Sequence, residues 1–270
     1  MDYDQGIDYL TEYGYYDEGE GSVQSAVERY QIQHGGLIVD GNLGPKTLRS
    51  MNAPRCGCTA QMLRGQGAGL AKWPDRDWLN DPLLYSFERF VRGIAPDRQR
   101  QLAKEAVDSW ANVCGIMARE VKVGERPDVV ISTGSGRKDN FDGPGRTLAW
   151  AYVAGSLLKF DESETWGESG NSIHWKNVFA HEWGHIIGLD HSNIESALMA
   201  PFYTESVFAP QSPDDAEEGV RRYGKPVKVP DPSDPGDPSG GGTAKMAFEF
   251  PGDVWTVTEK IGGIWRVEAK

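Results

Sequence analysis

Residues 181–191 read HEWGHIIGLDH, and this stretch organises the fold and the chemistry that we predict for the chain. Residues four apart on a helix share one face, so His181 and His185 can offer two imidazole nitrogens to one metal ion. Gly188 tolerates a positive φ, which lets the helix end and brings His191 back as a third ligand. Three protein ligands leave one zinc position open, as in catalytic rather than structural sites. The stretch therefore predicts one catalytic zinc.

Glu182 lies beside the face that carries the two helical histidines. It cannot reach the metal together with both of them, but it can reach a water bound to the metal, where a general base acts. An accidental origin is disfavoured because three of the five histidines of the chain fall within this one stretch. We therefore predict that Glu182 is the catalytic base.

The extended motif resembles that of the metzincin metallopeptidases, and Asp190 narrows the resemblance to the matrixins, or matrix metalloproteinases. The methionine turn of that family is matched by SALMAPFY, residues 196–203. The resemblance implies that Met199 packs beneath the ligand histidines. It also implies that Pro201 and Tyr203 wall the pocket for the substrate side chain that follows the scissile bond.

The resemblance extends to a strand and to a late helix. It implies that Ala149 and Ala151 bind substrate. It also implies that Asp215, in a helix predicted over residues 213–224, binds the new amino terminus that activation creates.

Composition limits the classes of partner. The 270 residues are 39% hydrophobic, which is enough for a core, and the net charge of −12 argues against nucleic acid and anionic membrane surfaces. We expect no membrane span, and the first residues lack the pattern of a signal peptide. The resemblance implies an extracellular or secreted protein that acts on protein or peptide substrates.

Residues 1–58 are predicted to form a small helical domain. Val23, Ala26, Val27, Tyr30 and Gln31 have the spacing of the inner face of a helix, and a second helix is predicted after the turn at residues 40–45. The region resembles the peptidoglycan-binding-like module that serves as the matrixin prodomain, most closely in VDGNLGPKTL, residues 39–48.

PRCG, residues 54–57, resembles the matrixin cysteine switch. Cys56 is then a thiolate ligand in the fourth zinc position, which keeps the enzyme latent, and Arg55 orients the loop. Cys58 departs from the family pattern, so a Cys56–Cys58 bond or a switch carried by Cys58 stays open. The three cysteines, the third being Cys114, are too few for a disulfide framework.

Residues 59–72 are rich in glycine and other small residues, and we predict that they form the activation segment.

The catalytic domain is predicted over residues 73–224. Strands are expected at residues 83–87, 129–132, 148–153 and 157–160, and an amphipathic helix at residues 96–111. Together with the zinc helix they predict an α+β fold with a twisted mixed sheet.

Residues 141–145 read FDGPG. This glycine-rich loop with one carboxylate predicts a calcium site. The resemblance to the matrixin calcium loop implies six ligands, which are Asp142, Gly143, Gly145, Thr147, Asp161 and Glu164. The second zinc of the family is not expected, because Trp150 and Lys159 stand where matrixins carry two of its histidines.

Residues 225–244 are rich in proline and glycine and predict a linker, followed by three short strands within residues 245–270. Such a small sheet is marginal alone, so we expect it to dock on the enzyme or on an unknown partner.

Two functions follow from the sequence. The first is a latent zinc endopeptidase that cleaves before a hydrophobic residue. The alternative is a zinc-binding protein of the same fold without turnover, which acts as a binding or assembly module through residues 245–270.

Overall fold

The structure is a computed structural model that describes residues 1–17, 19, 21–34, 36–59, 72–210, 213–226, 247–250, 253–261 and 264–269. The chain falls into two compact units, Met1–Val227 and Lys228–Lys270. The predicted activation segment, 59–72, and the predicted linker, 225–244, lie almost entirely outside the described residues. The division of the first unit into residues 1–58 and 73–224 stays a prediction.

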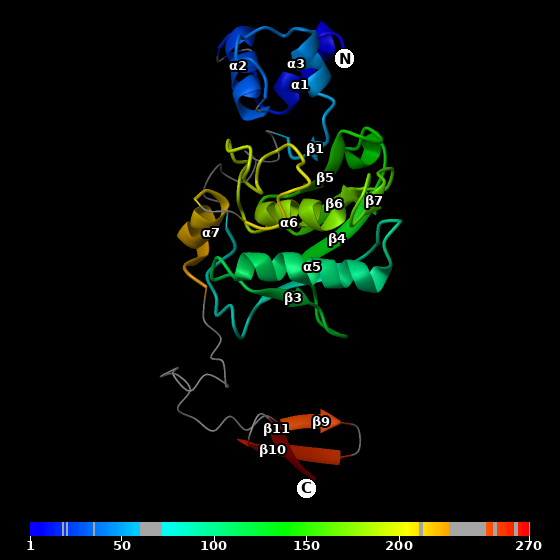
Figure 1. The fold of residues 1–270 in the computed structure, drawn as a ribbon, viewed down its shortest axis with the longest axis vertical. Coiled ribbons are helices and arrows are strands. Elements are labelled where there is room, and N and C mark those ends of the chain that lie inside the picture. The colour runs from blue at the N-terminus through cyan, green and yellow to red at the C-terminus, as the bar shows by residue number, and fades with distance from the viewer. Residues whose placement is uncertain are drawn as a thin grey trace. The chain divides into compact units, whose positions relative to one another are not determined.

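Three helices form the N-terminal part of the first unit: α1 (Tyr3–Glu12), α2 (Val23–His34) and α3 (Pro45–Ser50) (Figure 1). Asp2 and Gln5 close a capping box at the start of α1, and Pro45 opens α3. Their core holds Tyr9, Leu10, Tyr15, Ala26, Val27, Tyr30 and Met51. The helix predicted from the apolar spacing is α2, but α1 was not predicted.

The remainder of the first unit is built on a six-stranded sheet. Its strands are β1 (Arg55–Cys56), β2 (Leu83–Phe87), β3 (Ala118–Glu120), β4 (Val129–Gly134), β5 (Thr147–Ala151) and β6 (Leu157–Asp161), in the order β1-β5-β6-β4-β2-β3. The β5–β6 pair is antiparallel, with Ala149 opposite Phe160, and the other pairs are parallel. The predicted α+β fold with a mixed sheet is confirmed. The two shortest strands, β1 and β3, were not predicted.

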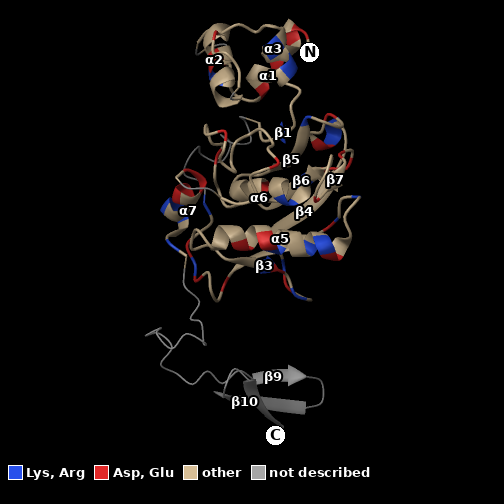
Figure 2. Ribbon diagram, in the orientation of Figure 1, with Lys and Arg blue, Asp and Glu red and all other residues tan. Residues whose placement is uncertain are grey.

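Two helices, α5 (Pro96–Ala111) and α6 (Trp175–Ile186), pack on each other, and α6 also contacts β5 and β6. Trp110 of α5 donates its indole N–H to the carbonyl of Ala180 at 2.9 Å. Figure 2 shows charged residues along α5, whereas α6 is mostly uncharged. Eleven of the twelve residues of α6 are buried, so the histidines on this helix lie in the core and out of bulk water.

Shorter elements complete the first unit: the 3₁₀ helix η1 (Arg137–Asp139), the paired strands β7 (Trp166–Gly167) and β8 (Ile173–His174), and α7 (Asp215–Tyr223). The second unit holds three strands, β9 (Ala247–Phe250), β10 (Asp253–Ile261) and β11 (Ile264–Ala269), and β10 pairs antiparallel with both of the others. Among the described residues, no helix has both the length and the apolar character that crossing a membrane requires.

Candidate active site

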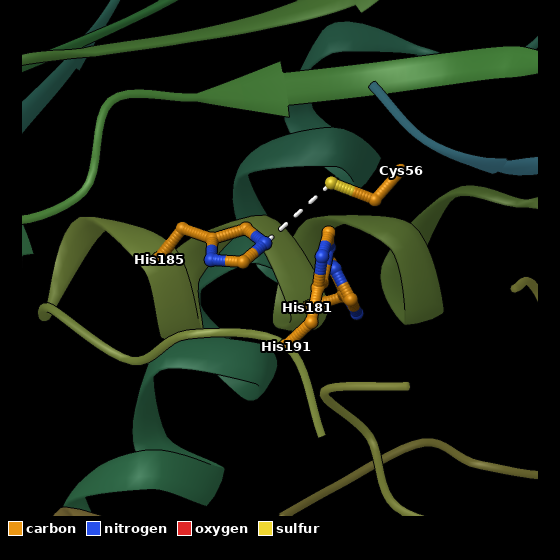
Figure 3. Close-up of side chains that lie close together, drawn as sticks. All are labelled: Cys56, His181, His185 and His191. Carbon is orange, nitrogen blue, oxygen red and sulfur yellow. Dashed lines mark hydrogen bonds between the residues drawn. The ribbon is translucent and has the colours of Figure 1, made fainter. Parts of the chain in front are cut away.

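Helix α6 and the turn after it bring three histidines together. His181 and His185 lie one turn apart on α6, and Gly188, with φ 96°, turns the chain back to His191. The ring centroids are 4.9 Å apart for His181 and His185, and 4.8 Å apart for His185 and His191. Figure 3 shows these side chains converging with that of Cys56. One ligand atom from each of the four residues lies within 4.8 Å of the others.

Backbone carbonyls fix the tautomers of the two helical histidines. Nδ1 of His181 lies 2.7 Å from the carbonyl oxygen of Leu198, and Nδ1 of His185 lies 2.7 Å from that of Leu189. A carbonyl can only accept, so each Nδ1 carries the proton and each Nε2 keeps its lone pair. Burial lowers the pKa of His181 to about 4 and that of His185 to about 3, so both rings are neutral.

Orphaned nitrogens show that this donor set fits a metal. Nε2 of His181 and Nε2 of His191 are buried without a hydrogen-bond partner among the described residues. An unpartnered buried nitrogen is costly unless something else binds it. A set of three imidazole nitrogens and one sulfur binds zinc in preference to harder cations such as calcium and magnesium.

Cys56 supplies the fourth member of the cluster from β1. Its Sγ lies 3.5 Å from Nε2 of His185, the contact drawn in Figure 3, and its side chain is 5% exposed. Burial raises the pKa of the Cys56 thiol, so in the metal-free protein the thiol donates to that ring nitrogen. A thiol that binds a zinc ion is deprotonated.

Glu182 is buried beside the histidines. Its Oε1 has no hydrogen-bond partner among the described residues, and its Oε2 lies 3.9 Å from the Sγ of Cys58. In the metal-free protein, burial raises the pKa of Glu182 to about 8, so this carboxyl holds a proton more tightly than an exposed glutamate does.

Met199 packs directly against α6. A Cβ atom at position 184 would collide with the sulfur of Met199. Because Gly184 has no side chain, the methionine can approach the helix between His181 and His185. The carbonyl of Met199 accepts a 2.8 Å hydrogen bond from the N–H of Ser192, which follows the third histidine. The methionine turn therefore braces both the helix and the loop that carries His191.

The segment 54–57 lies between β5 and the turn 201–203. On one side, the N–H of Arg55 donates to the Arg146 carbonyl and the N–H of Gly57 donates to the Ala149 carbonyl, both at 2.7 Å. On the other side, the N–H of Cys56 donates to the carbonyl of Pro201 at 2.9 Å. The N–H of Tyr203 also donates to the carbonyl of Pro54 at 2.9 Å. The segment therefore bonds to the backbone of Ala149, Pro201 and Tyr203, three of the residues that the resemblance implies for substrate binding.

Arg55 ties this segment to the N-terminal helices. Its guanidinium lies 3.6 Å from the ring centroid of Tyr13 and 5.1 Å from that of Phe202, and it donates to the Tyr9 hydroxyl at 2.5 Å. The side chain is only 2% exposed. Stacking of a desolvated guanidinium on aromatic rings is worth about 2 kcal/mol. Phe202 was not predicted as a contact.

A small cavity of about 30 Å³ opens beside Glu182 and His181, and Leu148, Val178, Leu198, Tyr203 and Val207 are among the residues that line it. Asn177 also lines it, one helical turn before His181, and was not predicted. Its amide donates to the carbonyl of Glu205 at 3.0 Å. The i, i+4 spacing from the first histidine is the signal that could have found it.

The predicted calcium ligands lie in separate hydrogen bonds. Asp142 accepts from the N–H of Thr147 at 3.1 Å and pairs with Arg146 at 2.5 Å, while Glu164 accepts from the N–H of Gly145 at 2.6 Å. Asp161 is fully buried, and its Oδ2 has no partner among the described residues.

The three carboxylates that are predicted to bind calcium nevertheless lie near enough for their charges to interact. Burial raises the pKa of Glu164, and the charges of Asp161 and Asp142 raise it further. Among the described residues, however, they do not form a cluster of ligand atoms within 4.8 Å of one another. Asp142 pairs with Arg146 instead. The calcium site stays a prediction.

Trp150 and Lys159, which stand where matrixins carry two histidines of their second zinc site, both contact Asp139. Nζ of Lys159 lies 2.8 Å from Oδ1 of Asp139, and the indole N–H of Trp150 donates to the Asp139 carbonyl at 2.8 Å. These contacts tie η1 to β5 and β6, and the absence of a second zinc stays a prediction.

Comparisons with known proteins agree with this architecture. The family model for matrixin matches residues 77–224, and a family model for a peptidoglycan binding domain matches residues 6–51. Matrix metalloproteinase-16 of Rattus norvegicus is 30% identical over 240 residues, which cover 79% of this chain and 39% of that protein.

Two further relatives show the same range of similarity. Matrix metalloproteinase-19 of Homo sapiens is 29% identical over 315 residues, with 97% of this chain and 59% of that protein covered. Macrophage metalloelastase of Rattus norvegicus is 33% identical over 218 residues, with 75% of this chain and 44% of that protein covered. The chain spans between 39% and 59% of the length of these relatives. Because the matrixin match covers more than half of the 270 residues and includes the histidine motif and the methionine turn, the chain belongs to the matrixin family.

Proposed function

We propose that the protein is a zinc-dependent endopeptidase held in a latent form by its own N-terminal region. The observation that carries this proposal is the convergence of His181, His185, His191 and Cys56 within 4.8 Å, with Glu182 buried beside them. Membership of the matrixin family supports the same reaction class.

The chemistry divides between the metal and the protein. A zinc ion held by the three histidines supplies a Lewis acid for peptide hydrolysis. Glu182 accepts a proton from the attacking water and delivers it to the leaving amine. Burial raises the pKa of Glu182 and so raises its affinity for that proton. The carbonyls of Leu198 and Leu189 hold the rings of His181 and His185 in one tautomer.

Substrate binding follows from the contacts of residues 54–57. A peptide that replaces this segment adds to the edge of β5 through the backbone of Ala149 and Ala151 and faces Pro201 and Tyr203. The cavity beside Glu182, lined largely by apolar residues, supports a preference for a hydrophobic residue after the scissile bond. Protein or peptide substrates outside the cell are the corresponding proposal for partners and location.

Latency is proposed from the same segment. Cys56 faces the histidines, and residues 54–57 use the backbone groups that substrate needs, so both the metal and the cleft are blocked. Residues 1–58 are the prodomain in this proposal, residues 59–72 the activation segment and residues 73–224 the catalytic domain. The proposed function also includes a structural calcium ion bound by Asp142, Asp161 and Glu164.

Peptide hydrolysis tests the proposal directly. The full chain and a chain of residues 73–224 are loaded with zinc and incubated with a quenched fluorescent peptide that carries leucine at its centre. We expect the shorter chain to cleave before the leucine and the full chain to be nearly inactive. A shorter chain that binds zinc but cleaves nothing would favour the binding module in residues 245–270.

A further inference from the structure

Cys58 lies in the active site although the proposed reaction does not need it. Cys56 is the last residue of β1 and Cys58 follows two residues later, and one ligand atom of each belongs to a single cluster. The Sγ of Cys58 lies 3.2 Å from the carbonyl oxygen of Ala151 and 3.9 Å from Oε2 of Glu182. Its side chain is 1% exposed. One thiol therefore faces the histidines while the next faces the base.

The two sulfurs are near enough to join. Cys56, Cys58, Glu182 and His185 form a second cluster whose ligand atoms all lie within 4.8 Å of one another. The N–H of Cys58 already donates to the Sγ of Cys56 at 3.3 Å. Two residues of an extended chain span about 6.6 Å, which is within the Cα separations that disulfides bridge. Rotation of the two side chains can supply the remaining approach.

A cavity lies beside the residues that flank Cys58, although neither cysteine lines it. A cavity of about 1230 Å³ is bounded by Gly57 and Thr59, the two neighbours of Cys58, and by Tyr152 of the opposite segment. β1 itself is only two residues long. Local opening of this short strand is the movement by which a disulfide would reach the two buried sulfurs.

We propose that Cys56 and Cys58 are a redox site at which a low-molecular-weight disulfide forms an intramolecular Cys56–Cys58 bond and unlocks the active site of the uncut chain. This rests on the proposed latency through Cys56. A sulfur in a disulfide is no longer a thiolate ligand, so the histidines lose their fourth partner. The same bond draws the thiol of Cys58 away from Glu182.

The reaction balances with the external disulfide as oxidant. One cysteine thiolate attacks the external disulfide, forms a mixed disulfide and releases one thiolate. The other cysteine then attacks the protein sulfur of that mixed disulfide and releases the second thiolate. Two electrons pass from the cysteines to the external disulfide, whose two sulfurs leave as thiols with the two cysteine protons.

The experiment uses the full chain loaded with cobalt(II), because a thiolate on cobalt gives a charge-transfer absorption band that reports Cys56 on the metal. The protein is incubated with oxidised glutathione, and its disulfides are mapped by mass spectrometry after the free thiols are blocked. We expect a Cys56–Cys58 disulfide, a mass lower by two hydrogen atoms, loss of the band and a rise in peptide hydrolysis. Dithiothreitol should restore the band.

Matched variants decide between the pair and a single reactive cysteine. Cys114→Ser should respond like the unaltered chain, because Cys114 is buried elsewhere, against the carbonyl of Trp110. Cys58→Ser should keep the band under the same treatment. Equal loss of the band in Cys58→Ser, or no Cys56–Cys58 disulfide in the unaltered chain, would overturn the proposal.

The proposed latency and this inference fail in different ways. If Cys56→Ser is inert without oxidant, the endopeptidase or its latency is wrong, whereas the disulfide map and the cobalt band still report on the pair. If Cys56→Ser is active and the unaltered chain forms the disulfide but keeps the band, the redox site does not control the metal and the proposal is wrong.

Discussion

The backbone N–H of Met199 donates a 3.0 Å hydrogen bond to Oδ1 of Asp215, the first residue of α7. Oδ2 of the same carboxylate accepts from the N–H of Leu198 at 2.7 Å. The carbonyl of Leu198 in turn accepts from His181 at 2.7 Å. A carboxylate that is 1% exposed therefore orients a metal ligand through one peptide unit. Its family-implied role with a new amino terminus stays a prediction.

We expect Asp215→Asn to lower the free energy of unfolding by about 1–3 kcal/mol, because an amide leaves one buried N–H of the methionine turn without an acceptor. Zinc affinity should fall as well, since His181 loses its support. Urea unfolding and zinc titration measure the two effects. Asp214→Asn, at the neighbouring and partly exposed residue, is the matched control and should change neither.

Glu182→Gln should keep the metal and lose the chemistry. The amide cannot take up the proton, so we expect kcat of the chain of residues 73–224 to fall by about 10²–10⁴. Zinc content, measured by elemental analysis, should remain one per chain because Glu182 is not a predicted ligand. Glu195→Gln at an exposed residue serves as the control. Full activity in Glu182→Gln would rule out the proposed mechanism.

Cys56→Ser should activate the full chain without cleavage. A neutral hydroxyl is a much weaker zinc ligand than a thiolate, so the metal no longer anchors residues 54–57 and a substrate peptide can displace them from the cleft. Peptide hydrolysis by the uncut protein measures the gain, and Cys114→Ser should leave the chain latent. If the full chain of Cys56→Ser stays inactive while residues 73–224 are active, the N-terminal helices block the cleft without the thiol.

Lys159→Met should destabilise the first unit, because it removes the ion pair that joins β6 to η1. The Lys159–Asp139 pair joins side chains that are each 19% exposed, so we expect a loss of about 1 kcal/mol. A double-mutant cycle with Asp139→Asn isolates the pair in thermal unfolding. A coupling free energy near zero between Lys159 and Asp139 would mean that the ion pair does not stabilise the fold.

The same pair predicts a pH dependence. The hydrogen bond from Lys159 is the largest cause that lowers the pKa of Asp139. In the acid range the unfolded chain then binds the proton at a higher pH than the folded chain does, so acid favours unfolding. The contribution is complete above about pH 4 and is lost as the pH falls further. In Lys159→Met the difference in stability from the unaltered chain should therefore shrink in acid.

Local sequence patterns were sufficient for the elements that carry the chemistry. The bounds of β2 and α5 agree with the predicted 83–87 and 96–111, because apolar periodicity and Pro96 at the helix start are written in adjacent residues. The convergence of His181, His185 and His191 follows from helical spacing and one glycine turn. The resemblance to matrixins added the pairing of Cys56 with these histidines.

Tertiary structure alone decided what surrounds that cluster. Cys58 reaches Glu182, Asp215 reaches Met199 and Arg55 reaches Phe202 across long stretches of chain. None of these contacts has a local pattern, since each depends on how β1, α6 and α7 are packed rather than on the residues beside it. A two-residue strand such as β1 has too little periodicity to be recognised, and it forms because β5 offers it an edge to pair with.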